Sequence, residues 1–79
     1  MEKPLVLMFS VDTYDREKLQ TKKGEELYEL AQKGVEEGDC DIYTFEQFLF
    51  DINEGEDCLN AWWCFPYYVP TIEAIKWLK

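Results

Sequence analysis

The chain contains no histidine, which removes the most common general base, the most common zinc ligand and every serine–histidine or cysteine–histidine nucleophile pair. Its cysteines, Cys40, Cys58 and Cys64, form no C-x-x-C pair, so neither a zinc knuckle nor a thioredoxin-like site is expected. Four glycines are too scattered for a phosphate-binding loop. The sequence therefore predicts a protein that is not an enzyme and that holds no cofactor and no metal.

Long hydrophobic runs are also missing. The run Leu5–Phe9 is far shorter than the roughly 20 residues that cross a bilayer, and the N-terminus lacks the apolar segment and cleavage site of a signal peptide. An odd number of cysteines at irregular spacing is not typical of a secreted disulfide framework. We therefore expect a cytoplasmic protein that binds no membrane, with residues 1–79 forming a single domain.

Basic residues are absent from the middle of the chain. Residues 1–35 carry seven acids and six bases, whereas residues 36–57 carry nine acids and no base, which accounts for the net charge of -9. Such a field repels nucleic acid and attracts basic proteins, while the simpler interpretation is that it keeps an aromatic-rich protein soluble. The predicted acidic face consists of Glu36, Glu37, Asp39, Asp41, Glu46, Asp51, Glu54, Glu56 and Asp57.

The spacing of apolar residues predicts three strands that alternate with three helices. A helix over Glu25–Lys33 has Gly34 in the position of a C-cap. Thr44-Phe-Glu-Gln47 fits a capping box and begins a helix that ends near Asn53–Gly55. Its predicted core face is Phe45, Phe48, Leu49 and Ile52, with Phe50 at the margin or exposed. The other predicted elements are strands at 4–11, 41–44 and 61–65 and a terminal helix over 70–79, capped by Thr71.

This alternation favours an α/β fold, a small single domain that is βαβαβα-like with a three-stranded, mostly parallel sheet and Leu5–Phe9 in its centre. The alternative is an α+β fold with the strand Ala61–Phe65 antiparallel at the edge. In such a strand Trp62 and Trp63 face opposite sides, and Pro66 either ends the strand or holds it at an edge. A short helix ending at Pro66 is the other interpretation of this segment.

Two aspartates follow the first predicted strand. Phe9-Ser-Val-Asp12-Thr-Tyr-Asp15 resembles the first motif of haloacid-dehalogenase-type phosphatases, although the second aspartate comes three residues after the first instead of two. At the carboxyl end of a parallel strand, Asp12 and Asp15 would lie where a magnesium ion binds. The competing interpretation is that both residues make local turn or cap hydrogen bonds.

Five aromatic residues lie between Trp62 and Tyr68, more than one strand and its exit loop can point inward. Because Trp and Tyr are enriched in binding hot spots, we predict that Trp62, Trp63, Tyr67 and Tyr68 form a partner-binding edge. The expected function is a small acidic interaction protein that binds a partner protein, most favourably a basic one, or itself as a homodimer, with the acidic face steering association. The alternatives are a DNA-mimic inhibitor of a nucleic-acid-binding enzyme and a magnesium site at Asp12 and Asp15.

Overall fold

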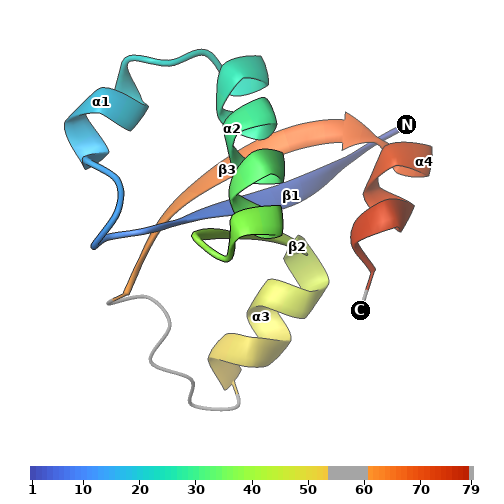
Figure 1. Cartoon of the computed structure of the whole chain (residues 1–79). Helices are drawn as coiled ribbons and strands as arrows, with labels where there is room; N and C mark the ends of the chain where they lie inside the picture. The colour runs from blue at the N-terminus through green and yellow to red at the C-terminus, as the bar shows by residue number, and fades with distance from the viewer. Residues whose placement is uncertain (54–60, 79) are drawn as a thin grey trace.

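The computed structural model describes residues 1–53 and 61–78, which form a sheet with helices packed around it (Figure 1). The elements are β1 (Glu2–Ser10), α1 (Arg16–Gln20), α2 (Gly24–Glu37), β2 (Cys40–Thr44), α3 (Phe45–Asn53), β3 (Trp62–Pro70), α4 (Thr71–Ala74) and the 3-10 helix η2 (Ile75–Trp77).

The sheet has the strand order β2-β1-β3, and both pairs are antiparallel. The predicted βαβαβα-like, mostly parallel sheet is therefore wrong, and the fold is α+β. The alternative prediction was an α+β fold with the aromatic strand antiparallel at the edge, and β3 is antiparallel to β1 at one edge of the sheet. The central position predicted for Leu5–Phe9 is confirmed, because these residues belong to β1 and are buried.

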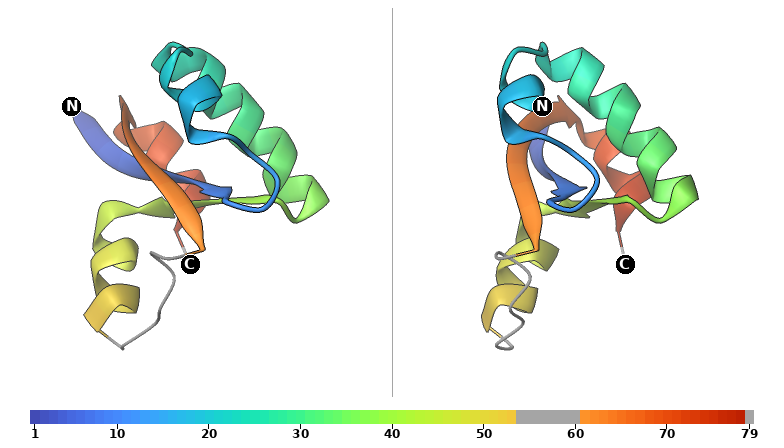
Figure 2. Two further views of the ribbon diagram at one scale, coloured as in Figure 1. Left: turned by 90° about the vertical axis from the view of Figure 1, so that its left-hand side faces the viewer. Right: turned by 60° about the vertical axis from the view of Figure 1, so that its left-hand side comes forward.

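The parallel sheet is predicted because the apolar run Leu5–Phe9 shows no alternation of apolar and polar residues. The structure explains this pattern differently, because both faces of the antiparallel strand β1 are buried. Leu5, Leu7 and Phe9 belong to the main core, to which α2 contributes Leu27 and Ala31. The intervening residues Val6 and Met8 are also buried, at 6% and 2% exposure, on the opposite face of β1. Figure 2 shows α2 and α3 on opposite sides of the strands, and α3 contacts both β1 and β2. A central antiparallel strand covered on two sides gives the same sequence pattern as a parallel one.

The helix α2 extends beyond its predicted end. It continues through Gly34 to Glu37, and Gly38, with a φ of 89°, is the C-cap. The prediction that Gly34 is the cap is therefore wrong. Gly34 instead permits close packing on β2, because a Cβ atom at this position would lie 2.1 Å from the Cys40 Sγ.

The helix α3 begins where the capping box predicted it. The Thr44 hydroxyl oxygen accepts a hydrogen bond from the Gln47 backbone N–H at 3.3 Å. The predicted core face is only partly covered, because Phe45 and Leu49 are each 43% exposed. Among the described side chains, this helix therefore leaves part of its apolar face in solvent.

The terminal helix is shorter than predicted, because α4 ends at Ala74 and the 3-10 helix η2 follows. Thr71 is not its cap. Its hydroxyl group donates to the Met1 carbonyl oxygen at 3.0 Å, and Pro70 occupies the N-cap position. These contacts hold the start of α4 beside the N-terminus of β1.

Candidate functional site

The aromatic strand β3 forms one edge of the sheet. It pairs with β1 from Glu2 opposite Pro70 to Ser10 opposite Trp62, and no strand in the described part of the chain pairs with its outer side. Pro66 lies in the middle of β3 without ending it. A proline is tolerated there because its nitrogen, which has no hydrogen, faces away from β1.

The position of Pro66 also fixes the direction of the neighbouring backbone groups. In an antiparallel pair, residues alternate between those whose N–H and C=O groups point at the partner strand and those whose groups point away. Pro66 belongs to the second set, and so do Trp62 and Tyr68, which lie an even number of residues from it. The Val11 N–H donates to the Ala61 carbonyl at 3.1 Å, which agrees with this alternation. The N–H groups of Trp62 and Tyr68 therefore point outward.

Two of the four predicted partner-binding residues pack against the core. The Trp63 indole N–H donates to the Tyr14 carbonyl oxygen at 3.1 Å, and the Arg16 guanidinium lies 5.8 Å from the Trp63 ring centre. The Tyr67 ring lies 5.2 Å from the Tyr28 ring. Both side chains are half-buried, and they fasten β3 to α1, α2 and the loop before α1.

The other two predicted residues, Trp62 and Tyr68, lie on the opposite face of β3, since their positions alternate with those of Trp63 and Tyr67. Tyr68 is 62% exposed and Trp62 is half-buried. The structure therefore divides the four residues between two faces of the strand. The exposed residues of this edge are Pro66, Tyr68 and Pro70, with Trp62 half-buried, and the N–H groups of Trp62 and Tyr68 point outward.

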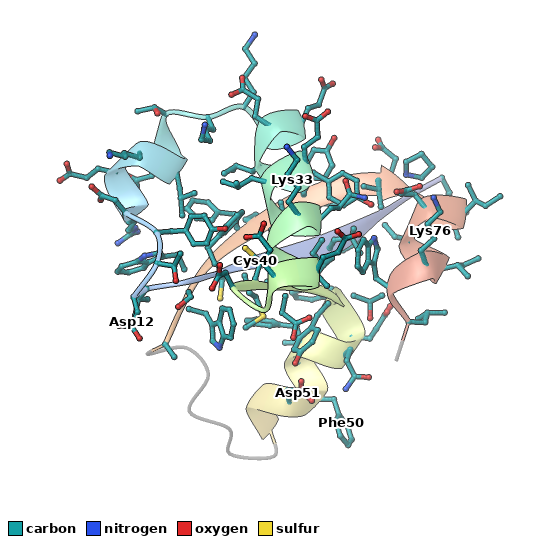
Figure 3. All side chains as sticks on the ribbon, viewed as in Figure 1. Asp12, Lys33, Cys40, Phe50, Asp51 and Lys76 are labelled. Atoms are coloured by element: carbon teal, nitrogen blue, oxygen red, sulfur yellow. The ribbon has the colours of Figure 1, made fainter. Side chains whose placement is uncertain are left out.

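The predicted acidic face is distributed over three elements. The Asp41 carboxylate accepts from the Ile42 N–H at 2.9 Å, and the Asp51 carboxylate accepts from the Gln47 side-chain amide at 3.1 Å. Figure 3 shows Asp51 on α3, well separated from Asp12 after β1. Glu36 and Glu37 lie in the last turn of α2, Asp39 precedes β2, Asp41 lies in β2, Glu46 and Asp51 lie in α3, and Glu54, Glu56 and Asp57 lie outside the described residues.

The two aspartates considered for magnesium are placed differently from the prediction. Because both neighbours of β1 run antiparallel to it, β1 does not end at the carboxyl edge of a parallel sheet. The Asp15 carboxylate accepts from the Glu17 N–H at 3.0 Å and caps α1, while Asp12 is exposed. Within residues 1–53 and 61–78, no group of three acidic or cysteine side chains is arranged to hold a metal ion.

Cys40 offers no reactive thiolate. Cys40 is buried behind Gly34 and Tyr14, and burial raises the pKa of its thiol. A hydrogen bond with Cys40 and burial likewise raise the pKa of Tyr14. A nucleophilic cysteine needs a lowered pKa, so the raised pKa of Cys40 disfavours a role as a nucleophile. Its side chain instead packs in the hydrophobic core. Cys64 is half-buried, and Cys58 lies outside the described residues.

A polar cluster that the sequence did not predict attaches the C-terminal segment to α2. The Tyr28 hydroxyl donates to the Glu73 carboxylate at 2.5 Å and accepts from the Trp77 indole N–H at 2.9 Å, and Lys76 lies 3.0 Å from Glu73. Burial, followed by the hydrogen bond to Glu73, raises the pKa of Tyr28 to about 12. The hydrogen bond from Tyr28, followed by that from Lys76, lowers the pKa of Glu73. No pattern in the sequence indicates that Tyr28 contacts Glu73 and Trp77, because these two residues follow it by 45 and 49 positions in the chain.

A small cleft of about 210 Å³ lies between the N-terminal part of β1, the start of α3 and the C-terminal helices. Its apolar wall includes Ile75 and Leu78, while Lys3 and Glu46 line it with opposite charges. This mixture of signs selects neither an anionic nor a cationic ligand. The remaining lining residues are Pro4, Thr44, Thr71 and Ala74.

Compared with known proteins, the chain matches no family model, no curated protein and no solved structure. None of the helices in the described ranges has the length and apolar character needed to cross a membrane. Large apolar side chains of the described residues reach solvent at three places: the edge strand β3, the helix α3, and the C-terminal segment with Ile72, Ile75 and Leu78. Of these, β3 also presents an unpaired strand edge, and α3 also carries charges of a single sign.

Proposed function

We propose that this chain is a small acidic interaction protein that binds a partner protein through the outer edge of β3. The observation that carries the proposal is the position of a nine-residue aromatic strand at the edge of the sheet, with Tyr68 62% exposed. An edge strand can accept a further strand through its outward backbone groups, and side chains at alternate positions then contact the added segment. Trp62 and Tyr68 occupy such alternate positions.

The packing beneath this edge favours binding, because a surface that is already ordered loses little conformational entropy when the partner arrives. Trp63 is held by the Tyr14 carbonyl and Arg16, and Tyr67 is held by Tyr28. These contacts fix the β3 backbone on its inner face, and no strand within residues 1–53 and 61–78 pairs with its outer side. Pro66, which offers no N–H group, limits an added strand to carbonyl contacts at that position.

The charge of the chain supports a basic partner over a second copy. Two copies that each carry a net charge of -9 repel one another, whereas a basic protein is attracted from a distance. Glu36 and Glu37 lie at the C-terminal end of α2, where the helix dipole disfavours acids. Acids at positions that disfavour helix stability suit a role in recognition. If the basic partner is a nucleic-acid-binding enzyme, the chain acts on it as a DNA mimic.

The experiment is site-specific photo-cross-linking in cells that produce the protein. Tyr68→p-benzoylphenylalanine and Trp62→p-benzoylphenylalanine are compared with the same residue at Lys33, an exposed position on α2. We expect cross-links to a basic protein from positions 62 and 68 and none from position 33. A product of twice the mass of the chain would indicate a homodimer. Equal yields from all three positions, or none from 62 and 68, would contradict the proposal.

A further inference from the structure

The helix α3 exposes three large apolar side chains to solvent. Phe45 and Leu49 are each 43% exposed and Phe50 is 58% exposed. Phe45 and Leu49 are separated by one helical turn, so their side chains are neighbours on the helix surface. Figure 3 shows Phe50 pointing away from the body of the fold. Three large apolar side chains on a nine-residue helix mark a candidate contact for another molecule.

The charges on this helix all have one sign. Glu46 and Asp51 are its only charged residues, and Glu46 lies one turn from Phe50. The last turn of α3 contains no basic residue, so the negative end of the helix dipole adds to the charge of Asp51. Around the helix, Glu46 lies between Leu49 and Phe50, and Asp51 lies on the other side of Phe50, so acids alternate with the exposed apolar side chains. Such a surface is complementary to one that mixes apolar and basic side chains, and a second copy of α3 would bring like charges together.

We propose that the exposed face of α3 binds a lysine- and arginine-rich amphipathic helix of another protein. Apolar side chains of that helix, spaced by three and four residues, cover Phe45, Leu49 and Phe50, while its cations lie beside Glu46 and Asp51. This surface is on a different element from the β3 edge, so it does not depend on the proposed strand addition. The two proposals are tested by different variants and can fail separately.

The test uses fluorescence anisotropy with the full chain and two labelled synthetic helices. One helix consists of leucine and lysine with leucine on one face, and the other carries glutamate in place of every lysine. We expect the lysine helix to bind and the glutamate helix not to bind. Phe50→Ser should raise the Kd of the lysine helix about tenfold, as expected for an apolar hot spot. Ile72→Ser, which alters a 78% exposed side chain on α4, should leave the Kd unchanged.

Paired charge variants separate a specific site from general attraction to an acidic protein. Glu46→Gln with Asp51→Asn removes two charges from α3, and Glu25→Gln with Glu29→Gln removes two from the exposed side of α2. We expect the α3 pair to weaken binding several-fold more than the α2 pair and to reduce the salt dependence more.

Three outcomes would overturn the proposal. Equal effects of the two charge pairs would show general attraction, and equal affinity for the lysine and glutamate helices would show that charge plays no part. A dimer of the chain alone that dissociates on Phe50→Ser in sedimentation analysis would assign the α3 face to a second copy. Thermal unfolding of each variant checks that it is folded. If Phe50→Ser does not fold, the comparison of the two charge pairs still tests the α3 site.

Discussion

Replacing Gly34 by alanine tests how α2 is packed on β2. The added Cβ would lie 2.1 Å from the Cys40 Sγ, 2.7 Å from the Cys40 Cβ and 3.2 Å from the Tyr14 hydroxyl. Rotation of the Cys40 side chain moves Sγ but not Cβ, which is fixed by the β2 backbone. The clash can therefore be relieved only if α2 moves away from the sheet, which loosens the core around Ala31 and Ile42.

Two opposing effects determine how much Gly34→Ala changes the free energy of unfolding. Alanine in a helix interior is about 1 kcal/mol more favourable than glycine. Overpacking a core costs about 1–3 kcal/mol, and contact with a fixed carbon at 2.7 Å lies at the upper end of that range. We therefore expect Gly34→Ala to lower the free energy of unfolding by about 2 kcal/mol. For a domain of this size, such a loss lowers the melting temperature by roughly 10 °C.

Urea and thermal unfolding followed by circular dichroism measure this loss. Gly38→Ala is the matched control, because no atom lies within 4 Å of its added Cβ and its cost comes from the φ of 89° alone, about 1 kcal/mol. Cys40→Ala in the Gly34→Ala background removes the Sγ contact and should recover part of the stability, which appears as a coupling term in a double-mutant cycle. If Gly34→Ala increases stability, as helix propensity alone predicts, the described packing of α2 on β2 is wrong.

Three further changes test the C-terminal cluster and the end of α2. Tyr28→Phe removes the hydroxyl that joins Glu73 to Trp77, and we expect a loss of about 1–2 kcal/mol in urea unfolding; an unchanged midpoint would refute this. Because the pKa of Glu73 is lowered in the folded state, its stabilisation is present above the ordinary carboxyl range and is lost as the pH falls through the folded pKa. Between about pH 6 and about pH 2, the urea midpoint should therefore fall less steeply for Glu73→Gln than for the unmodified chain. Parallel pH profiles of the two proteins would argue against the contacts of Glu73 with Tyr28 and Lys76. Glu37→Lys places a cation at the negative end of α2 and should raise stability at low salt by about 0.3–1 kcal/mol in thermal unfolding, whereas a lower melting temperature would contradict the dipole argument.

The sequence predicted local structure better than the direction of the strands. The alternation of Trp62 and Trp63 and the cap at Thr44 follow from interactions within a few residues, and the structure contains both. The direction of β2 and β3 relative to β1 depends on where the connecting helices lie. An apolar run such as Leu5–Phe9 is compatible with either direction whenever helices cover both faces.

The solvent exposure of individual aromatic residues was also beyond the sequence pattern. Strand periodicity places Trp63 and Tyr67 on one face, but their partners Tyr14 and Tyr28 come from distant segments. The helix pattern likewise could not show that Phe45 is left 43% exposed, because coverage of that face depends on the surrounding tertiary structure. Periodicity therefore identified the apolar faces, and only the fold showed which of them reach solvent.

Amide hydrogen exchange in β3 tests the central claim most directly. The N–H groups of Trp62 and Tyr68 point away from β1, whereas those of Trp63 and Tyr67 belong to the set that points toward it. When the protein captured by cross-linking at position 68 is added, exchange at Trp62 and Tyr68 should slow by at least tenfold, with little change at Trp63 and Tyr67. Unchanged exchange at Trp62 and Tyr68 in a chain saturated with that protein would show that the partner does not bind at the edge of the sheet.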